Sequence, residues 1–115
     1  MIEQKILQEF VNNAVLHGIY TNNGDYKLCN KASKKLLAII KPLEKDELAA
    51  QEFINELLHN EDPSVIIWLS VLVSKVNYKK EVFHQKLKTI SSNKSLKLIS
   101  FSANKMLDEW FENAE

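Results

Sequence analysis

The sequence predicts an all-α protein of about six helices, stacked as helical hairpins in a HEAT-like array. Apolar residues recur at intervals of three and four along most of the chain, which is the spacing of one helix face. Only 2 Gly and 2 Pro occur among 115 residues, which favours a few long helices over many tight turns. Between two apolar stretches stands Asp62-Pro63, where Asp62 can cap a helix and Pro63 can occupy its first position. This pattern indicates a helix, a tight turn and a second, buried helix.

The first two helices are expected over residues 2–17 and 25–41. Gly18 follows the first apolar stripe and is placed for a left-handed C-terminal cap. Asp25 is placed to cap the second helix. Pro42 is expected to end that helix, because proline disfavours helical dihedrals in the residue before it.

The third and fourth helices are expected over residues 45–59 and 63–76. Residues 65–73 form a nearly unbroken apolar run that is rich in β-branched side chains, which also suits a strand. The Asp-Pro start and the helical neighbours favour a helix that is buried on most sides. Trp68 and Leu69 are therefore expected in the core.

The last two helices are expected over residues 78–91 and 94–112. Residues 53–73 and 83–106 resemble each other weakly at an offset of 31 or 32 residues, a period in the range that helical solenoids use. Three stacked hairpins would close a continuous core, so we expect a single domain over residues 1–115.

Composition indicates a cytoplasmic protein without a membrane segment. The longest apolar run has nine residues, and a bilayer-spanning helix needs roughly 20. The N-terminus lacks the basic and apolar regions of a signal peptide. The single cysteine, Cys29, excludes an internal disulfide, which suits a reducing compartment.

No motif in the sequence predicts catalysis, a metal or a cofactor. Cys29 lies beside an apolar stripe, so we interpret it as a small buried hydrophobic residue. The three histidines share no metal-ligand spacing, and neither a glycine-rich phosphate loop nor a Ser/His/Asp signature occurs. We expect a protein that is not an enzyme and uses no cofactor.

The net charge of zero hides a strong segregation of charge. Residues 44–62 carry seven acids against Lys45, whereas residues 75–105 carry eight lysines against Glu81. Such blocks can steer a partner of opposite charge, and the alternative is that each block is a solvated face that pairs with its neighbour. All fifteen basic residues are lysine, so bidentate recognition of phosphate or guanine by arginine is absent.

Two acidic segments are candidate partner-binding surfaces. The first comprises Glu44, Asp46, Glu47, Glu52 and Glu56, and the second Asp108, Glu109, Trp110 and Glu112. Trp110 and Phe111 are adjacent, so both cannot point into one helical stripe, and one of them could anchor a partner. The alternative is that they cap the open end of the core.

The chain resembles a family of small bacterial HEAT-like helical proteins of unknown function. The resemblance is carried by Asp62-Pro63-x-Val65-x-x-Trp68 and Phe101-x-Ala103-x-x-x-Leu107-x-x-Trp110, and it covers about residues 25–110. Ile66 stands where such repeats usually have Arg, and Leu69-Ser70 where they have a pair of alanines. Members are often encoded beside polymorphic or contact-dependent toxins, so the resemblance implies a cytoplasmic immunity protein.

We therefore predict a non-enzymatic immunity protein that binds a bacterial toxin and occludes it. A nuclease toxin has a basic cleft for phosphate, which the acids of residues 44–56 could occupy. The alternative is a cytoplasmic scaffold or a nucleic-acid-associated HEAT-like module that uses the lysines of residues 75–105. Nucleic acid is disfavoured as a partner, because no aromatic residues interleave with these lysines and the net charge is zero. The oligomeric state stays open.

Overall fold

The computed structural model describes residues 2–112. Within them the chain forms six α-helices and no strand, which confirms the all-α prediction. A 3₁₀ turn, η1 (Lys94–Leu96), precedes the last α-helix, and a π-helical segment, η2 (Leu107–Glu112), follows it. The α-helices are α1 (Gln4–Asn23), α2 (Tyr26–Glu44), α3 (Glu47–Leu57), α4 (Pro63–Val76), α5 (Lys80–Ser92) and α6 (Leu98–Met106).

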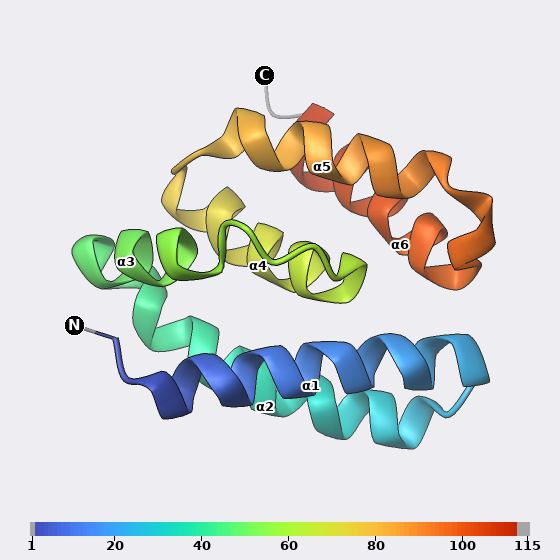
Figure 1. Ribbon diagram of the computed structural model, residues 1–115, viewed down its shortest axis with the longest axis horizontal. Coiled ribbons are helices and arrows are strands. Elements are labelled where there is room, and N and C mark those ends of the chain that lie inside the picture. Colours follow the sequence, from blue (N-terminus) through green and yellow to red (C-terminus); the bar gives the residue numbers. More distant parts are fainter. Residues whose placement is uncertain (1, 113–115) are drawn as a thin grey trace.

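The helices pair into three antiparallel hairpins that lie in layers. The α3/α4 hairpin lies between α1/α2 and α5/α6, and successive helices alternate in direction (Figure 1). The outer hairpins also touch each other, since α1 contacts α6 and the Leu98 backbone N–H donates to Asn22 Oδ1 at 3.2 Å. The array is therefore closed along one side of α4.

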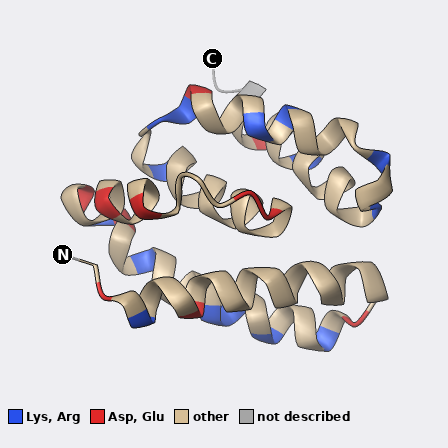
Figure 2. Cartoon of the chain, in the orientation of Figure 1, with Lys and Arg blue, Asp and Glu red and all other residues tan. Residues whose placement is uncertain are grey.

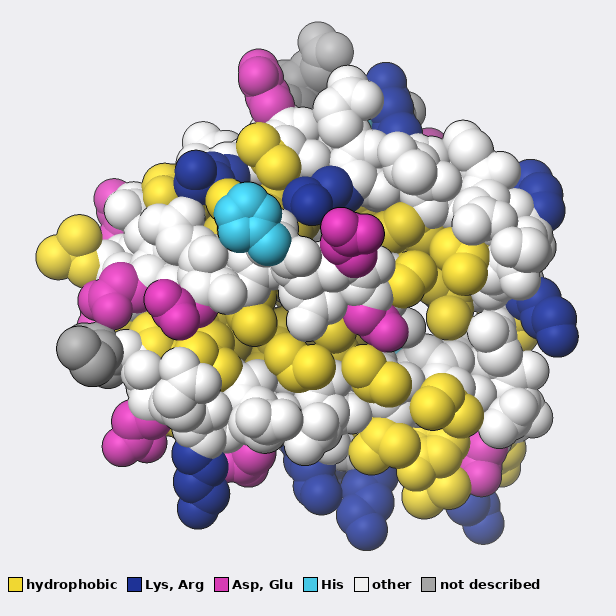
Figure 3. All heavy atoms as spheres, in the orientation of Figure 1, with side chains coloured by type: hydrophobic (Ala, Val, Ile, Leu, Met, Phe, Trp, Pro, Cys, Tyr) yellow, Lys and Arg dark blue, Asp and Glu magenta, His cyan; other side chains and the backbone are white. Residues whose placement is uncertain are grey.

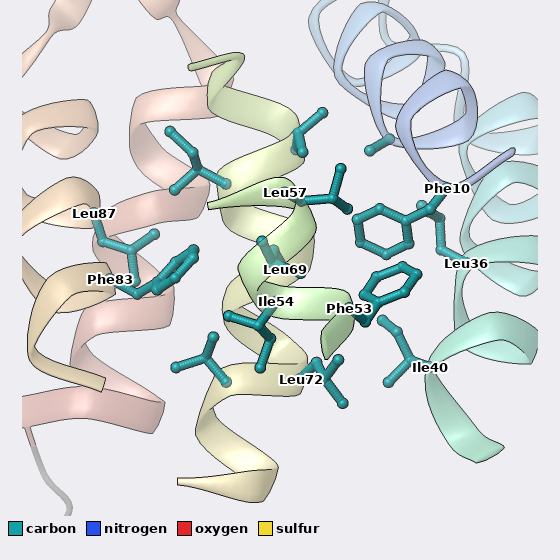
Figure 4. Packing of buried hydrophobic residues seen from close by; sticks show 14 of the residues in the cluster. Phe10, Leu36, Ile40, Phe53, Ile54, Leu57, Leu69, Leu72, Phe83 and Leu87 are labelled. Atoms are coloured by element: carbon teal, nitrogen blue, oxygen red, sulfur yellow. The ribbon is translucent and has the colours of Figure 1, made fainter. Parts of the chain in front are cut away.

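Helix α4 is the centre of the fold, because it contacts each of the other five α-helices. The strand alternative for residues 65–73 is wrong, because this run is helical and most of its side chains are buried. Phe10 of α1 meets Phe53 of α3 edge to face at 5.1 Å between ring centroids (Figure 4). The aliphatic core around them draws on α2, α4 and α5 and includes Leu36, Ile40, Leu69, Leu72 and Leu87.

Aspartate side chains cap the N-termini of three of the helices. Asp62 Oδ1 accepts the backbone N–H groups of Ser64 and Val65 at 2.9 and 3.2 Å, and Pro63 occupies the first helical position as predicted. Asp25 and Asp46 cap α2 and α3 in the same way, each accepting one backbone N–H at 3.2 Å. Each such cap satisfies donors that the helix cannot satisfy internally.

The predicted ends of the first two helices are wrong. Helix α1 continues through Gly18 to Asn23 and ends at Gly24, whose φ of 75° is left-handed. Helix α2 continues past Pro42 to Glu44. Proline removes only one intrahelical bond in this last turn, and the following residues are held by tertiary contacts: Leu43 packs on the core and Glu44 pairs with Lys75.

The predicted continuous helix over residues 94–112 is also wrong, because the chain breaks at Lys97. Asn93 Oδ1 accepts both the backbone N–H and the hydroxyl of Ser95, which holds η1 as a separate turn. Lys97 then adopts φ 58° and ψ −125°, and α6 begins at Leu98. Asn and Ser side chains compete here with the helical backbone bonds.

Residues that align in the weak internal repeat are not buried to the same extent. At an offset of 32 residues, Leu69 of α4 aligns with Phe101 of α6, yet Leu69 is 1% exposed and Phe101 63% exposed. Ala103 is the fully buried residue of α6. The hairpins thus share a shape but not a common register of core residues.

Candidate functional site

The exposed side of α3 carries most of the first predicted acidic segment. Asp46, Glu47, Glu52 and Glu56 are all exposed. Figure 2 shows the acids gathered on α3 and on the segment that leads into α4, between two layers that carry most of the lysines. The buried stripe of α3 faces the other way and consists of Ala50, Phe53, Ile54 and Leu57.

One leucine stands among these acids. Leu48 is 76% exposed and lies one helical turn before Glu52, on the same side of α3. We call Leu48 together with Asp46, Glu47, Glu52 and Glu56 the acidic face. Sequence reasoning missed Leu48, although its position off the buried stripe was the available signal.

Two of the predicted acids also have structural roles. Asp46 caps α3, as described above. Glu44 is half-buried, and its Oε1 lies 3.4 Å from Lys75 Nζ. A partly exposed pair of this kind contributes up to about 1 kcal/mol. Glu44 is therefore less accessible to a partner than the glutamates of α3.

Lys75 connects the two predicted acidic segments. Besides pairing with Glu44, its Nζ lies 5.0 Å from the centroid of the Trp110 ring, in a cation–π contact. Trp110 is 38% exposed, and Asp108 and Glu109 beside it are exposed. The side chain of Glu112 lies outside the described residues. The fold thus places Glu44 and Trp110, 66 positions apart in sequence, on either side of one ammonium group.

The adjacent aromatic residues of η2 point to different neighbours. Phe111 is half-buried and stacks on the His84 ring of α5, with 6.2 Å between ring centroids and an interplanar angle of 14°. Lys80 Nζ lies 5.7 Å from the same Phe111 ring. The sequence-based argument that the two aromatics must diverge is confirmed.

His17, Trp68 and Cys29 lie near one another between α1, α2 and α4. The His17 and Trp68 rings meet edge to face at 5.0 Å, and Trp68 is half-buried against the core. Burial lowers the pKa of His17 from its ordinary value of 6.5. Cys29 is half-buried rather than buried, and its thiol contacts Thr21 Oγ1 at 3.3 Å and donates to the His17 carbonyl at 3.6 Å.

Residues 2–112 contain neither a metal-binding group of side chains nor a membrane-spanning helix. No group of three or more His, Cys, Asp or Glu side chains in this range could hold a metal ion. Across the same range, every helix is too short or too polar to cross a bilayer.

Comparison with known proteins finds no matching family model, no matching curated protein and no matching solved structure. The resemblance to a HEAT-like immunity family therefore stays a prediction.

Proposed function

We propose that this chain is a non-enzymatic immunity protein, which binds a bacterial toxin domain through the acidic face of α3 and blocks it. The supporting observation is Leu48, an exposed apolar side chain on the same side of α3 as Glu52 and close in sequence to Asp46 and Glu47. Protein interfaces combine an apolar centre with a polar rim, and Leu48 among the acids of α3 has this arrangement. The proposed partner surface is correspondingly basic, with a small apolar depression.

A nuclease toxin offers such a surface, because it binds phosphate in a basic cleft. Acids of α3 in that cleft would exclude the nucleic acid sterically and electrostatically. Long-range attraction between opposite charges raises the association rate, so we expect association to slow as salt rises. The exposed Trp110 and its neighbouring acids are a second candidate contact, joined to Glu44 through Lys75.

The test is to co-express this chain with the C-terminal fragment of a toxin gene that neighbours its own gene. We expect the wild-type chain to restore growth. We expect the Glu47→Lys, Glu52→Lys, Glu56→Lys triple variant to lose that protection, and Leu48→Ala to weaken binding about tenfold, as loss of an interface anchor does.

Matched controls separate a specific surface from net charge or general apolarity. The Glu3→Lys, Glu9→Lys, Glu81→Lys variant changes the net charge equally at exposed acids outside the acidic face. Tyr26→Ala removes a side chain that is 69% exposed, on α2. Both controls should protect as well as wild type. Equal protection by the triple α3 variant, with an unchanged circular dichroism spectrum, would reject the acidic face. Recovery of RNA or DNA without a toxin, in an affinity pull-down with this chain, would favour the nucleic-acid-associated module instead.

A further inference from the structure

A small pocket opens where α1, α4 and α6 meet. These three helices contact one another pairwise, and the cavity between them has a volume of about 160 Å³. Its walls are mostly apolar, with Trp68, Val71 and Ile67 from α4, and Ile99 and Met106 from α6. An apolar cavity of about 150 Å³ in another protein holds one benzene molecule. This pocket therefore has room for one aromatic ring.

Two hydroxyl groups at the pocket already donate their single protons within the protein. Ser102 Oγ donates to the Leu98 carbonyl at 3.1 Å, and Thr21 Oγ1 donates to the His17 carbonyl at 2.8 Å. A hydroxyl has one donor and two acceptor lone pairs. Both oxygens therefore remain as acceptors.

His17, which also lines the pocket, extends this pattern. Its Nδ1 lies 3.4 Å from Thr21 Oγ1, whose proton is already used, so this contact favours the tautomer with the proton on Nδ1. In a neutral imidazole with the proton on Nδ1, Nε2 is an acceptor. Burial lowers the pKa of His17, which keeps the ring neutral at pH 7. Ser64 also lines the pocket, and its hydroxyl can donate or accept. The pocket thus offers several acceptors, one such hydroxyl and no formal charge.

We propose that this pocket binds a free, uncharged, single-ring aromatic compound that carries one hydroxyl donor, in other words a phenol. The ring would lie against Trp68 and the aliphatic walls, and the hydroxyl would donate to Ser102 Oγ, with Thr21 and His17 as neighbouring acceptors. The site is separate from the acidic face of α3, so it stands or falls independently of the proposed toxin binding.

Phenol and toluene are the decisive probes, because they have the same size and differ in the donor. Each is titrated into the full ¹⁵N-labelled chain, and the indole N–H resonance of Trp68 is followed after assignment with Trp110→Phe. A purely apolar cavity favours toluene, since it would bury the phenol hydroxyl without a partner. We expect phenol to bind with a dissociation constant in the range of about 0.1–1 mM, at least as tightly as toluene.

Variants test the acceptor and the cavity separately. Ser102→Ala should weaken phenol binding about fivefold and leave toluene unaffected, as expected for loss of one neutral hydrogen bond. Ser92→Ala is the matched control, because Ser92 on α5 is exposed and donates to the carbonyl four residues back at 2.9 Å. Val71→Phe and Ser102→Leu fill the cavity from two different helices, and at least one folded variant of this pair should abolish binding of both probes.

Four results would overturn the proposal. The first is the absence of any saturable shift with phenol, and the second is toluene binding more than tenfold tighter than phenol. The third is tighter binding of N-acetyl-tyrosinamide than of p-cresol, which would indicate a side chain of a protein partner as the occupant. The fourth is unchanged phenol binding by both filled variants in folded form, which would place the ligand elsewhere.

Discussion

Gly18 allows α1 and α4 to approach each other closely, because a Cβ at this position would overlap the Ser64 hydroxyl. The same Cβ would lie 3.0 Å from Ser64 Cβ and 3.4 Å from Ile99 Cδ1. The side of α1 that Gly18 keeps free also borders the pocket and His17. At this scale, a single residue sets how closely two helices approach beside a half-buried imidazole ring.

Gly18→Ala tests the close approach. Alanine gains about 1 kcal/mol of helix propensity, but the overlap costs about 1–3 kcal/mol. We expect the free energy of unfolding, measured with urea, to fall by about 1 kcal/mol. In a Ser64→Ala background the hydroxyl is gone, so the loss should shrink or reverse. A more stable Gly18→Ala protein with Ser64 intact would contradict the contact.

The lowered pKa of His17 predicts that the folded protein loses stability on acidification. Its pKa is lowered in the folded protein, so the unfolded chain, titrating near 6.5, takes up the proton first as pH falls. The stability that comes from burying the neutral His17 ring is fully present above pH 6.5 and is lost progressively below it. Urea midpoints between about pH 7 and pH 5 should therefore fall less steeply for His17→Asn than for wild type. Parallel curves would contradict the burial of the ring.

Among the elements, the end of the chain shows most clearly how local bonds interrupt a regular helical pattern. η1 is held by Asn93, α6 begins after Lys97, and η2 follows in π-helical geometry. Lys97 has φ 58° and ψ −125°, a conformation that favours glycine. The break lets the Leu98 N–H reach Asn22 of α1, which connects the first and third hairpins.

Lys97→Gly should stabilise the protein. Relief of the strained backbone is worth about 1–3 kcal/mol, and the extra entropy of glycine in the unfolded chain offsets up to about 1 kcal/mol. We expect a net gain of about 1 kcal/mol by urea unfolding. Lys97→Ala removes the same charge but keeps a Cβ, so it should give no gain. Equal effects of the two variants would show that Lys97 is not strained.

The whole molecule is organised around α4, which contacts every other α-helix. In an open solenoid, each repeat contacts only its neighbours, and stability is roughly a sum over repeats. Here α1 also contacts α6, so we expect the three hairpins to unfold together. The same closure creates the pocket, which no pair of helices forms alone.

Leu69→Asp tests this central role. Leu69 is 1% exposed, so aspartate would bury a charge without a partner. We expect a loss of more than about 3 kcal/mol, with all helices melting in one transition by circular dichroism. Leu48→Asp, at a position that is 76% exposed, is the control and should unfold close to wild type. A wild-type melting temperature for Leu69→Asp would contradict the core assignment.

The sequence by itself determined the all-α class, the approximate positions of the helices, the Asp62-Pro63 start of α4 and the exposure of the α3 glutamates, because these depend on spacing and capping within one segment. The tertiary structure alone decided the rest. Gly18 packs closely against Ser64 of α4, Lys75 joins two distant acidic segments, and three helices line the pocket that includes His17. Each of these features depends on residues far apart in the chain. The helical period of a segment predicts which of its sides is buried, but not which other helix packs against that side.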